Sequence, residues 1–274
     1  MSESVVIRPS RGWFDLGLGE LWTHRELLYY LVWREIKVRY KQTVIGAAWA
    51  VVQPLGMMLI FTVVFGKLLG VRTGEIPYPV FALAALVPWY YFAHAVQSAT
   101  TGIVEQKEVI TRVYFPRLLL PLASVTAPLV DAAISMVALA AVMAWFGIAP
   151  AASIAWLPLF ALLAAATALA IGLWLSALNA VYRDVRFLVP FGLQALMFAS
   201  PVVYPSGVIK NPTWQALYGL NPMAGVIEGF RWSLLGSGEP PGGTIWVSAA
   251  AVVVLLFGGL VFFRRMEGVV ADVV

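Results

Sequence analysis

Few residues of this chain have the types and spacing that catalysis requires. The sequence has no cysteine and only two histidines, His24 and His94, so neither a thiolate site nor a histidine-rich metal centre is expected. It lacks the Gly-x-x-x-x-Gly-Lys-Ser/Thr loop that binds nucleotide phosphates, and no Ser/His/Asp triad suggests itself. We therefore predict a chain that is not an enzyme, with no catalytic residue, no metal and no cofactor of its own.

A run of aromatic residues is the first candidate for a binding role. Trp89, Tyr90, Tyr91 and Phe92 follow Pro88, about half-way along an apolar stretch. Trp and Tyr often form belts at the membrane surface, but a belt fits this depth poorly. Aromatic rings inside a passage could face the apolar C–H surfaces of sugar rings and leave the sugar hydroxyls in water. We predict that the run contributes to the lining of a conduit.

Asp131 is the main charged residue within the apolar stretches. An acid in a membrane helix is by default a candidate functional group, here for a proton relay. The sequence shows no basic residue embedded near it, which favours a hydrogen-bonded acid at a contact between helices or subunits. His94, Gln97 and Asn179 are expected to make hydrogen bonds between helices.

The composition indicates that these residues are held by membrane-spanning helices. Of 274 residues, 61% are hydrophobic and 12% charged, whereas soluble domains are roughly a quarter charged. A spanning helix needs about 20 apolar residues, and six stretches approach or exceed that length. The predicted spans are 46–70, 78–101, 118–146, 153–180, 187–204 and 244–263. We predict a single all-α membrane domain with six transmembrane helices.

The basic residues predict the orientation of these spans. Most of the 18 Lys and Arg residues precede the first span, follow the last one, or fall in the segments after the second and fourth spans. Because cytoplasmic segments are enriched in Lys and Arg, both termini are expected in the cytoplasm. The net charge of +4 thus reports topology and does not suggest nucleic acid as a partner. The membrane lipids are the expected surroundings.

Residues 20–42 are predicted to form an amphipathic helix before the first span. Leu21, Leu28, Val32, Ile36 and Tyr40 can share one face, and Glu35 and Arg39 are spaced for an ion pair. Such a helix would lie along the cytoplasmic interface. The alternative is a plain basic anchor, and residues 36–41 also alternate apolar and basic side chains as a strand does.

The segment 205–243, on the outer side, is too long for a simple turn. Asn211-Pro212 and Asn221-Pro222 each place an N-cap residue before a proline suited to the first helical position. The second pair would begin a helix, PMAGVIEGFRWSLL, that ends near Gly236 and is too short to span. Its apolar stripe consists of Met223, Ile227, Phe230 and Leu234. We predict two short re-entrant helices within 206–240, with a surface cap as the alternative.

Several segments together resemble one family. WREIKVRYKQTVIGAAWAVVQPL at 33–55, SPVVYP at 200–205 and LNPMAGVIEGFRW at 220–232 resemble the transmembrane permease subunits of type-2 ABC exporters of polysaccharides. That family includes the O-antigen (lipopolysaccharide), capsule and teichoic-acid export permeases. The charged loop EQKEVITRVYFPR after the second span also matches in kind, although a solvated loop would read similarly.

The resemblance implies a homodimer with a conduit between its two copies. Two copies of a separate ABC-type ATPase would bind ATP and Mg and dock at the cytoplasmic face, and a polyprenyl-diphosphate-linked glycan would be the cargo. Residues 20–42 would be the interface helix. The coupling helix to the ATPase would include Glu105, Lys107, Glu108 and Arg112. The outer gate would be formed by Met223, Ile227, Phe230 and Leu234.

The same resemblance extends the two candidate binding surfaces. Phe198 and Tyr204 join the aromatic run in the expected conduit lining. The basic residues of the interface helix would contact either the lipid diphosphate or the ATPase, and both alternatives stay open; these residues are Arg34, Lys37, Arg39 and Lys41. The expected location is the cytoplasmic (inner) membrane of a bacterium.

Other functions remain as alternatives at this point. An ABC exporter of small hydrophobic molecules would share the same broad fold. A proton-coupled secondary transporter would use Asp131 and would work without ATP. A membrane-embedded glycosyltransferase is disfavoured, because the loops contain no acidic pairs.

Overall fold

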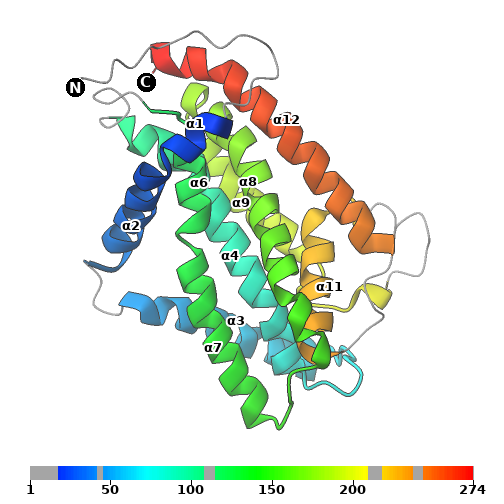
Figure 1. Cartoon of the computed structure of the whole chain (residues 1–274). Coiled ribbons are helices and arrows are strands. Elements are labelled where there is room, and N and C mark those ends of the chain that lie inside the picture. Colours follow the sequence, from blue (N-terminus) through cyan, green and yellow to red (C-terminus); the bar gives the residue numbers. More distant parts are fainter. Residues whose placement is uncertain (1–17, 42–45, 108–114, 209–217, 237–242, 274) are drawn as a thin grey trace.

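The computed structural model describes residues 18–41, 46–107, 115–208, 218–236 and 243–273, and the regular structure of these residues is entirely helical (Figure 1). The helices are α1 (Leu18–Thr23), α2 (Arg25–Lys41), η1 (Gly46–Ala48), α3 (Trp49–Phe61), η2 (Thr62–Leu68), α4 (Tyr78–Glu105), α6 (Leu119–Thr126), α7 (Leu129–Trp145), η3 (Ala152–Trp156), α8 (Leu157–Val181), α9 (Val185–Phe198), η4 (Ser206–Val208), α11 (Pro222–Leu235) and α12 (Gly243–Val273). The predicted all-α class is confirmed.

Five helical stretches are long and apolar enough to cross a membrane. They are Gly46–Leu68, Tyr78–Glu105, Leu119–Trp145, Ala152–Val181 and Ile245–Met266, and they coincide with five of the six predicted spans.

The remaining predicted span, 187–204 (the fifth in chain order), corresponds to the shorter helix α9. Its 14 residues extend about 21 Å at 1.5 Å per residue, less than the roughly 30 Å of a hydrocarbon core. The chain leaves the helix after Phe198 and continues through turns to Tyr204. A sixth full-length spanning helix is therefore not confirmed, because the apolar run includes residues that are not helical.

Helix α4 is the central element of the subunit. In the most apolar 18-residue stretch of α4, 78% is buried, whereas the corresponding stretches of the other four spans are 17–28% buried. Its apolar side chains occupy all sides, a pattern typical of a buried helix, and α3, α6, α7, α8 and α11 pack around it. In Figure 1 it lies behind α7 and α8. Its buried position fixes the directions in which residues 89–94 can point.

The helical conformation predicted for residues 20–42 is confirmed as far as Lys41, as two helices, α1 and α2, that meet at His24, but apolar side chains lie on both sides of α2, so its amphipathic character is weak. Leu31 is fully buried, and Leu28 and Val32 pack beside it against α6 and the end of α4. The strand-like residues 36–41 are helical to Lys41. On the opposite side Tyr29 and Tyr30 are exposed.

The predicted ion pair between Glu35 and Arg39 is not formed. Glu35 instead accepts hydrogen bonds from Ser124 Oγ at 2.9 Å and from Gln106 Nε2 at 3.4 Å. Arg39 pairs with Asp131 of α7. Partners on neighbouring helices thus replace the partner one turn away, because α2 packs closely against the spans.

The predicted ends of helix α11 are confirmed, while its predicted re-entrant placement in the membrane stays a prediction. The Asn221 side chain accepts a hydrogen bond from the Met223 N–H, Pro222 takes the first helical position, and Gly236 ends the helix with a φ of 61°. The four stripe residues named above are all buried against neighbouring helices. Asn211-Pro212, the other predicted helix start, lies outside the described residues.

A glycine sets the distance between α11 and α8. A Cβ built on Gly229 would lie 2.2 Å from the ring of Phe160, so only glycine fits at this contact. α11 therefore lies directly against α8, and it also packs against α4 and α12.

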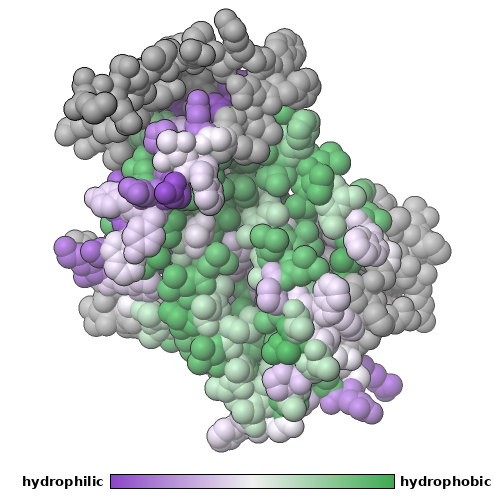
Figure 2. All heavy atoms as spheres, viewed as in Figure 1, coloured by the Kyte–Doolittle hydropathy of each residue, from purple (hydrophilic) through white to green (hydrophobic). Residues whose placement is uncertain are grey.

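The surface agrees with membrane insertion. Figure 2 shows apolar residues across the middle of this face, with hydrophilic residues concentrated near α2 and at the lower right. Exposed large apolar side chains include Trp145, Phe191 and Val254. An exposed apolar surface of this extent is expected to face lipid or another subunit.

Candidate functional site

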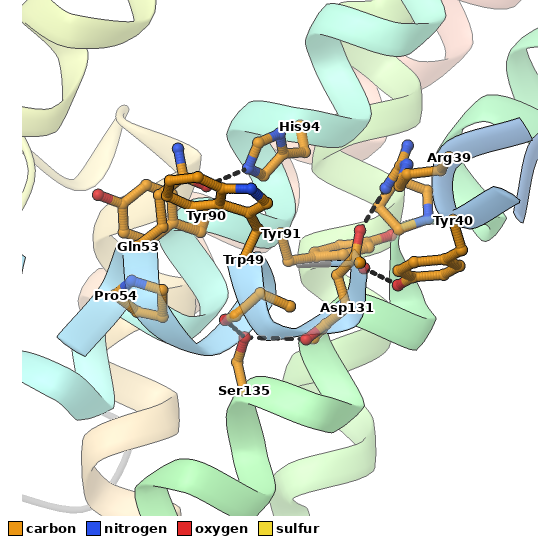
Figure 3. Close-up of a pocket in the computed structure, with 14 residues that line it drawn as sticks. Arg39, Tyr40, Trp49, Gln53, Pro54, Tyr90, Tyr91, His94, Asp131 and Ser135 are labelled. Atoms are coloured by element: carbon orange, nitrogen blue, oxygen red, sulfur yellow. Dashed lines mark hydrogen bonds and ion pairs between the residues drawn. The ribbon is translucent and has the colours of Figure 1, made fainter. Parts of the chain in front are cut away.

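The candidate site lies where α2, α3, α4 and α7 meet (Figure 3). Asp131 stands in the first turn of α7. The guanidinium of Arg39 donates to its Oδ2, and the hydroxyl of Tyr40 donates to its Oδ1. The expectation that Asp131 has no basic partner is therefore wrong. Its partner comes from the interface helix, 92 residues earlier in the chain.

The surroundings of this ion pair are intermediate between surface and interior. The side chain of Arg39 is 30% exposed and that of Asp131 is 18% exposed. Burial, followed by the hydrogen bond to Asp131, raises the pKa of Tyr40 to about 12. The Tyr40 hydroxyl therefore keeps its proton at neutral pH and remains a donor to the carboxylate.

A second polar contact joins α7 to α3. The Ser135 Oγ lies 2.6 Å from the backbone oxygen of Ala50 and 2.8 Å from that of Asp131. The start of α7 is thus linked both to α3 and to the end of α2. Movement of either helix should be transmitted to α7.

The four helices line an open cavity of about 310 Å³. Its polar and aromatic lining residues are Arg39 and Tyr40 of α2, Trp49 and Gln53 of α3, Tyr90, Tyr91 and His94 of α4, and Asp131 and Ser135 of α7. The rings of Tyr90 and His94 stack with centroids 6.2 Å apart. A His94 ring nitrogen lies 3.3 Å from Gln53 Oε1, which confirms His94 as an interhelical contact.

The aromatic run divides between this cavity and the subunit core. Tyr90 and Tyr91 line the cavity, and the Tyr91 hydroxyl donates to the Val125 oxygen at 3.1 Å. Trp89 and Phe92 are buried, with ring centroids 5.5 Å apart. This division follows from helix geometry, since four successive residues point in four directions.

The other two predicted lining residues lie away from the cavity. Phe198, at the end of α9, is 48% exposed. The Tyr204 hydroxyl donates to the Phe198 oxygen at 3.1 Å. The structure thus brings these two residues together, and their place in a conduit stays a prediction.

Of the basic residues predicted on the interface helix, Arg39 alone lines the cavity. Lys37 is exposed, with its ammonium 5.4 Å from the centroid of the Trp33 ring. Arg34 is half-buried and Lys41 is exposed at the end of α2. Sequence spacing grouped the four, but packing separates Arg39 from the rest.

Two of the predicted coupling residues are described. Glu105 ends α4 and is exposed, as is Lys107. Glu108 and Arg112 lie outside the described residues. Between Glu105 and Lys107, Gln106 is buried and contacts Glu35 of α2.

Burial raises the pKa of that Glu35 carboxyl, while the Ser124 hydrogen bond and the charges of Arg39 and Arg34 act in the opposite direction. The end of α4 and helix α2 are therefore joined through a half-buried carboxyl group.

Arg231 is a residue whose position the sequence reasoning missed. It is 5% exposed, and it donates to the backbone oxygens of Phe81 at 3.2 Å and Val202 at 2.8 Å. Its guanidinium carbon lies 3.5 Å from the centroid of the Phe81 ring. The signal in the sequence that could have indicated its burial is its position next to the apolar stripe of the short helix α11. Arg231 ties α11 to α4 and to the segment after α9.

Asn179 provides a further predicted interhelical contact, donating from Nδ2 to the Thr100 oxygen at 3.0 Å. Gln97, grouped with it in the sequence, is exposed. Among the described residues, no group of three or more His, Asp or Glu side chains is arranged to hold a metal ion.

Comparison with known proteins supplies the remaining evidence. The family described as "ABC-2 type transporter" matches residues 26–235. The chain is 29% identical over 252 residues to the "O-antigen export system permease protein RfbA" of Myxococcus xanthus, covering 90% of this chain and 96% of the relative.

Two further relatives are more distant. A Klebsiella pneumoniae protein of the same name is 26% identical over 75% of this chain and 79% of its own length. The "Polysialic acid transport protein KpsM" of Escherichia coli is 25% identical over 85% of this chain and 91% of its own length.

Proposed function

The chain belongs to the ABC-2 type transporter membrane family, and from that premise we propose that it is the permease subunit of an ATP-driven exporter of lipid-linked polysaccharide. The relatives with O-antigen and polysialic acid export in their names support this substrate class. The structural observation that carries the proposal is the aromatic and polar cavity at the junction of α2 with α3, α4 and α7.

The energy for transport comes from a separate ABC-type ATPase, two copies of which bind ATP and Mg below the membrane. The exposed Glu105 and Lys107 mark the contact with it. Between them, Gln106 contacts Glu35 of α2, and Arg39 and Tyr40 farther along α2 hold Asp131 of α7. A displacement at the end of α4 can thus pass through α2 to α7, as an ATP-driven change between two packings requires.

A second copy of the chain completes the conduit. A glycan longer than the membrane is thick cannot be enclosed in one cavity, so a continuous path is required. Helix α9 has a strongly exposed apolar face, with Phe187, Leu188 and Phe191 each at least 65% exposed. We place α9 and the residues after it, including Phe198 and Tyr204, beside that path and count this segment as the fifth of six crossings.

Helix α11 forms the outer gate in this proposal. Its apolar stripe packs inward, and Arg231 fastens it to α4. Both termini lie in the cytoplasm of a bacterium, with α2 at the inner surface of the cytoplasmic membrane. The ion pair favours a structural role for Asp131 over a proton relay, so a proton-coupled transporter is the weaker alternative.

The decisive experiment deletes the gene in its own strain and restores it on a plasmid. Loss of the gene should remove the glycan from the cell surface and leave lipid-linked glycan inside, and the restored chain should reverse both changes. Restoration should fail when the partner ATPase carries a substitution in its phosphate-binding loop. Export that continues without the ATPase, or ATP hydrolysis by the isolated chain, contradicts the proposal.

The coupling contact has its own test. Replacing Glu105, Glu108 and Arg112 together by alanine should leave ATP hydrolysis intact and abolish export, with the chain still in the membrane. Glu26→Ala, an exposed change on α2, is the matched control. Normal export by the triple variant contradicts this assignment.

A further inference from the structure

We propose that the cavity between α2, α3, α4 and α7 binds one uncharged sugar ring of the exported glycan and excludes the diphosphate of its carrier. This inference rests on the proposed function and specifies the ligand of that site. It also replaces the two roles left open for Arg39, as a phosphate ligand or as an ATPase contact, with a structural role as the partner of Asp131.

The charges of the cavity are already satisfied within the protein. Among its described lining residues, Arg39 is the one Lys or Arg and Asp131 the one carboxylate, and these two pair with each other. Tyr40 donates to the second oxygen of Asp131. A phosphate that used the remaining N–H groups of Arg39 would lie beside the Asp131 carboxylate that Arg39 Nη1 already holds. Such like-charge contacts are strongly unfavourable in a partly buried site.

The hydrogen-bonding groups that remain for a ligand are uncharged. Within the described residues, the amide nitrogen of Gln53 and the hydroxyl of Tyr90 make no hydrogen bond, although the Gln53 oxygen meets His94. An amide N–H₂ supplies two donors, and a phenol supplies a donor and an acceptor. Sugar hydroxyls both donate and accept, so they match these groups without any ionic charge.

Aromatic surface lies beside these groups. The Tyr90 ring stacks on His94, and Trp49 is 51% exposed while still lining the cavity. In Figure 3, Tyr90 and Gln53 lie on one side of the cavity and the ion pair lies on the other. A pyranose ring has an apolar C–H face and a polar edge, and it can therefore contact an aromatic ring and an amide together.

The size of the cavity limits the ligand. Its volume of about 310 Å³ is at the lower end of the roughly 300–1,000 Å³ found for small-molecule sites. The space suits one sugar unit, and because the cavity is open, the rest of the polymer would extend out of it. A fully apolar guest would leave the Gln53 amide without a partner, which disfavours a small hydrophobic substrate.

The absence of cysteine from the sequence allows a direct test. Ala50→Cys places a single thiol in the cavity lining, and Ala155→Cys places one on the exposed surface of η3 as the control. Both chains are purified with the partner ATPase in lipid nanodiscs and labelled with N-ethylmaleimide. The probes are the strain's own glycan released from its carrier by mild acid, inorganic pyrophosphate, and farnesol.

The glycan fragments should slow labelling of Ala50→Cys by about threefold when present at twice their dissociation constant, since occupancy protects in proportion to 1 + [L]/Kd. Ala155→Cys should be unaffected. Gln53→Ala or Tyr90→Phe in the Ala50→Cys chain should raise the dissociation constant obtained from this protection by about three- to tenfold, as expected for one lost neutral hydrogen bond. Trp145→Phe, a change at a ring that is 86% exposed at the end of α7, should not alter that constant.

Protection by pyrophosphate, protection by farnesol alone, or no protection by glycan each overturns the inference. The Ala50→Cys chain must also restore surface glycan in the deletion strain, so that failure of the proposed function can be distinguished from failure of the cavity assignment. If the deletion strain still displays its glycan, the proposed function fails. If the chain restores export and glycan does not protect, the cavity assignment alone fails.

Discussion

Asp131 offers the sharpest test of how the interface helix is attached to the spans. We consider Asp131→Asn, Arg39→Gln and the double variant. Asparagine keeps nearly the same shape and one acceptor oxygen for Tyr40, but it loses the charge that holds Arg39. If the pair anchors α2 to α7, each single change should destabilise the chain and the second change should add little to the first.

The expected magnitude follows from the exposure of the two side chains. Exposed ion pairs contribute about 0–1 kcal/mol, whereas removing one partner of a buried pair costs about 3–5 kcal/mol. With 30% and 18% of the side chains exposed, we expect a value between these limits. Asp131→Asn should cost about 1.5–3 kcal/mol, and the coupling energy from the double-mutant cycle should be about 1–2 kcal/mol.

The measurement is equilibrium unfolding of the purified chain in mixed dodecylmaltoside and SDS micelles, followed by tryptophan fluorescence. Asp184→Asn, at the start of α9, is the control for loss of a carboxylate elsewhere. If the single changes add within about 0.5 kcal/mol, the two residues are not coupled and the anchoring argument is refuted. In export assays, Asp131→Asn should lower ATP-dependent transport without abolishing it, because the asparagine oxygen still accepts from Tyr40, and complete loss with normal ATPase docking would favour the proton-relay alternative.

Three further predictions concern packing, a buried cation and pH. Gly229→Ala should lower the free energy of unfolding by at least about 2 kcal/mol, because its Cβ would overlap the Phe160 ring. The control, Gly192→Ala in α9, meets no atom within 4 Å and should change the free energy of unfolding by about 1 kcal/mol or less. Equal unfolding midpoints for the two variants would contradict the close contact. Arg231→Met should lower the free energy of unfolding by about 2–4 kcal/mol, because the Phe81 and Val202 oxygens lose their donor. The control, Arg72→Met at an exposed position, should change the free energy of unfolding little. Comparable decreases in both variants would show that Arg231 does not stabilise the packing of α11. Because burial raises the folded pKa of Glu35, the folded chain binds more protons than the unfolded one above pH 4.5, so stability contributed by this group is present at low pH and falls as pH rises through the raised pKa. Glu35→Gln should therefore stabilise the chain more at pH 8 than at pH 4, with exposed Glu26→Gln as control, and a pH-independent effect in unfolding experiments would refute this reasoning.

Much of the local structure could be predicted from the sequence. The apolar runs identified five of the helical spans, because burial of the backbone in lipid requires long continuous helices of apolar residues. Asn221-Pro222 and Gly236 bounded α11 to within a residue. These signals act between near neighbours in the chain, so each can be recognised without knowing what packs against it.

The fifth span and the aromatic run show where such patterns stop being sufficient. The apolar stretch 187–204 reads as one span, yet the helix ends at Phe198 and turns follow. Residues 89–92 are uniformly aromatic, so nothing in their pattern tells which side of the helix is buried. Packing of α4 at the centre of the subunit decided that Tyr90 and Tyr91 line the cavity and that Trp89 and Phe92 do not.

The amino-acid sequence by itself determined the membrane class, the family and the helix boundaries set by caps and apolar length. Only the tertiary structure decided that Arg39 and Tyr40 meet Asp131 and that Arg231 crosses to Phe81 and Val202. The physical reason is distance along the chain. An ion pair between residues 92 positions apart depends on how several helices pack at once, and no periodicity within one helix records it.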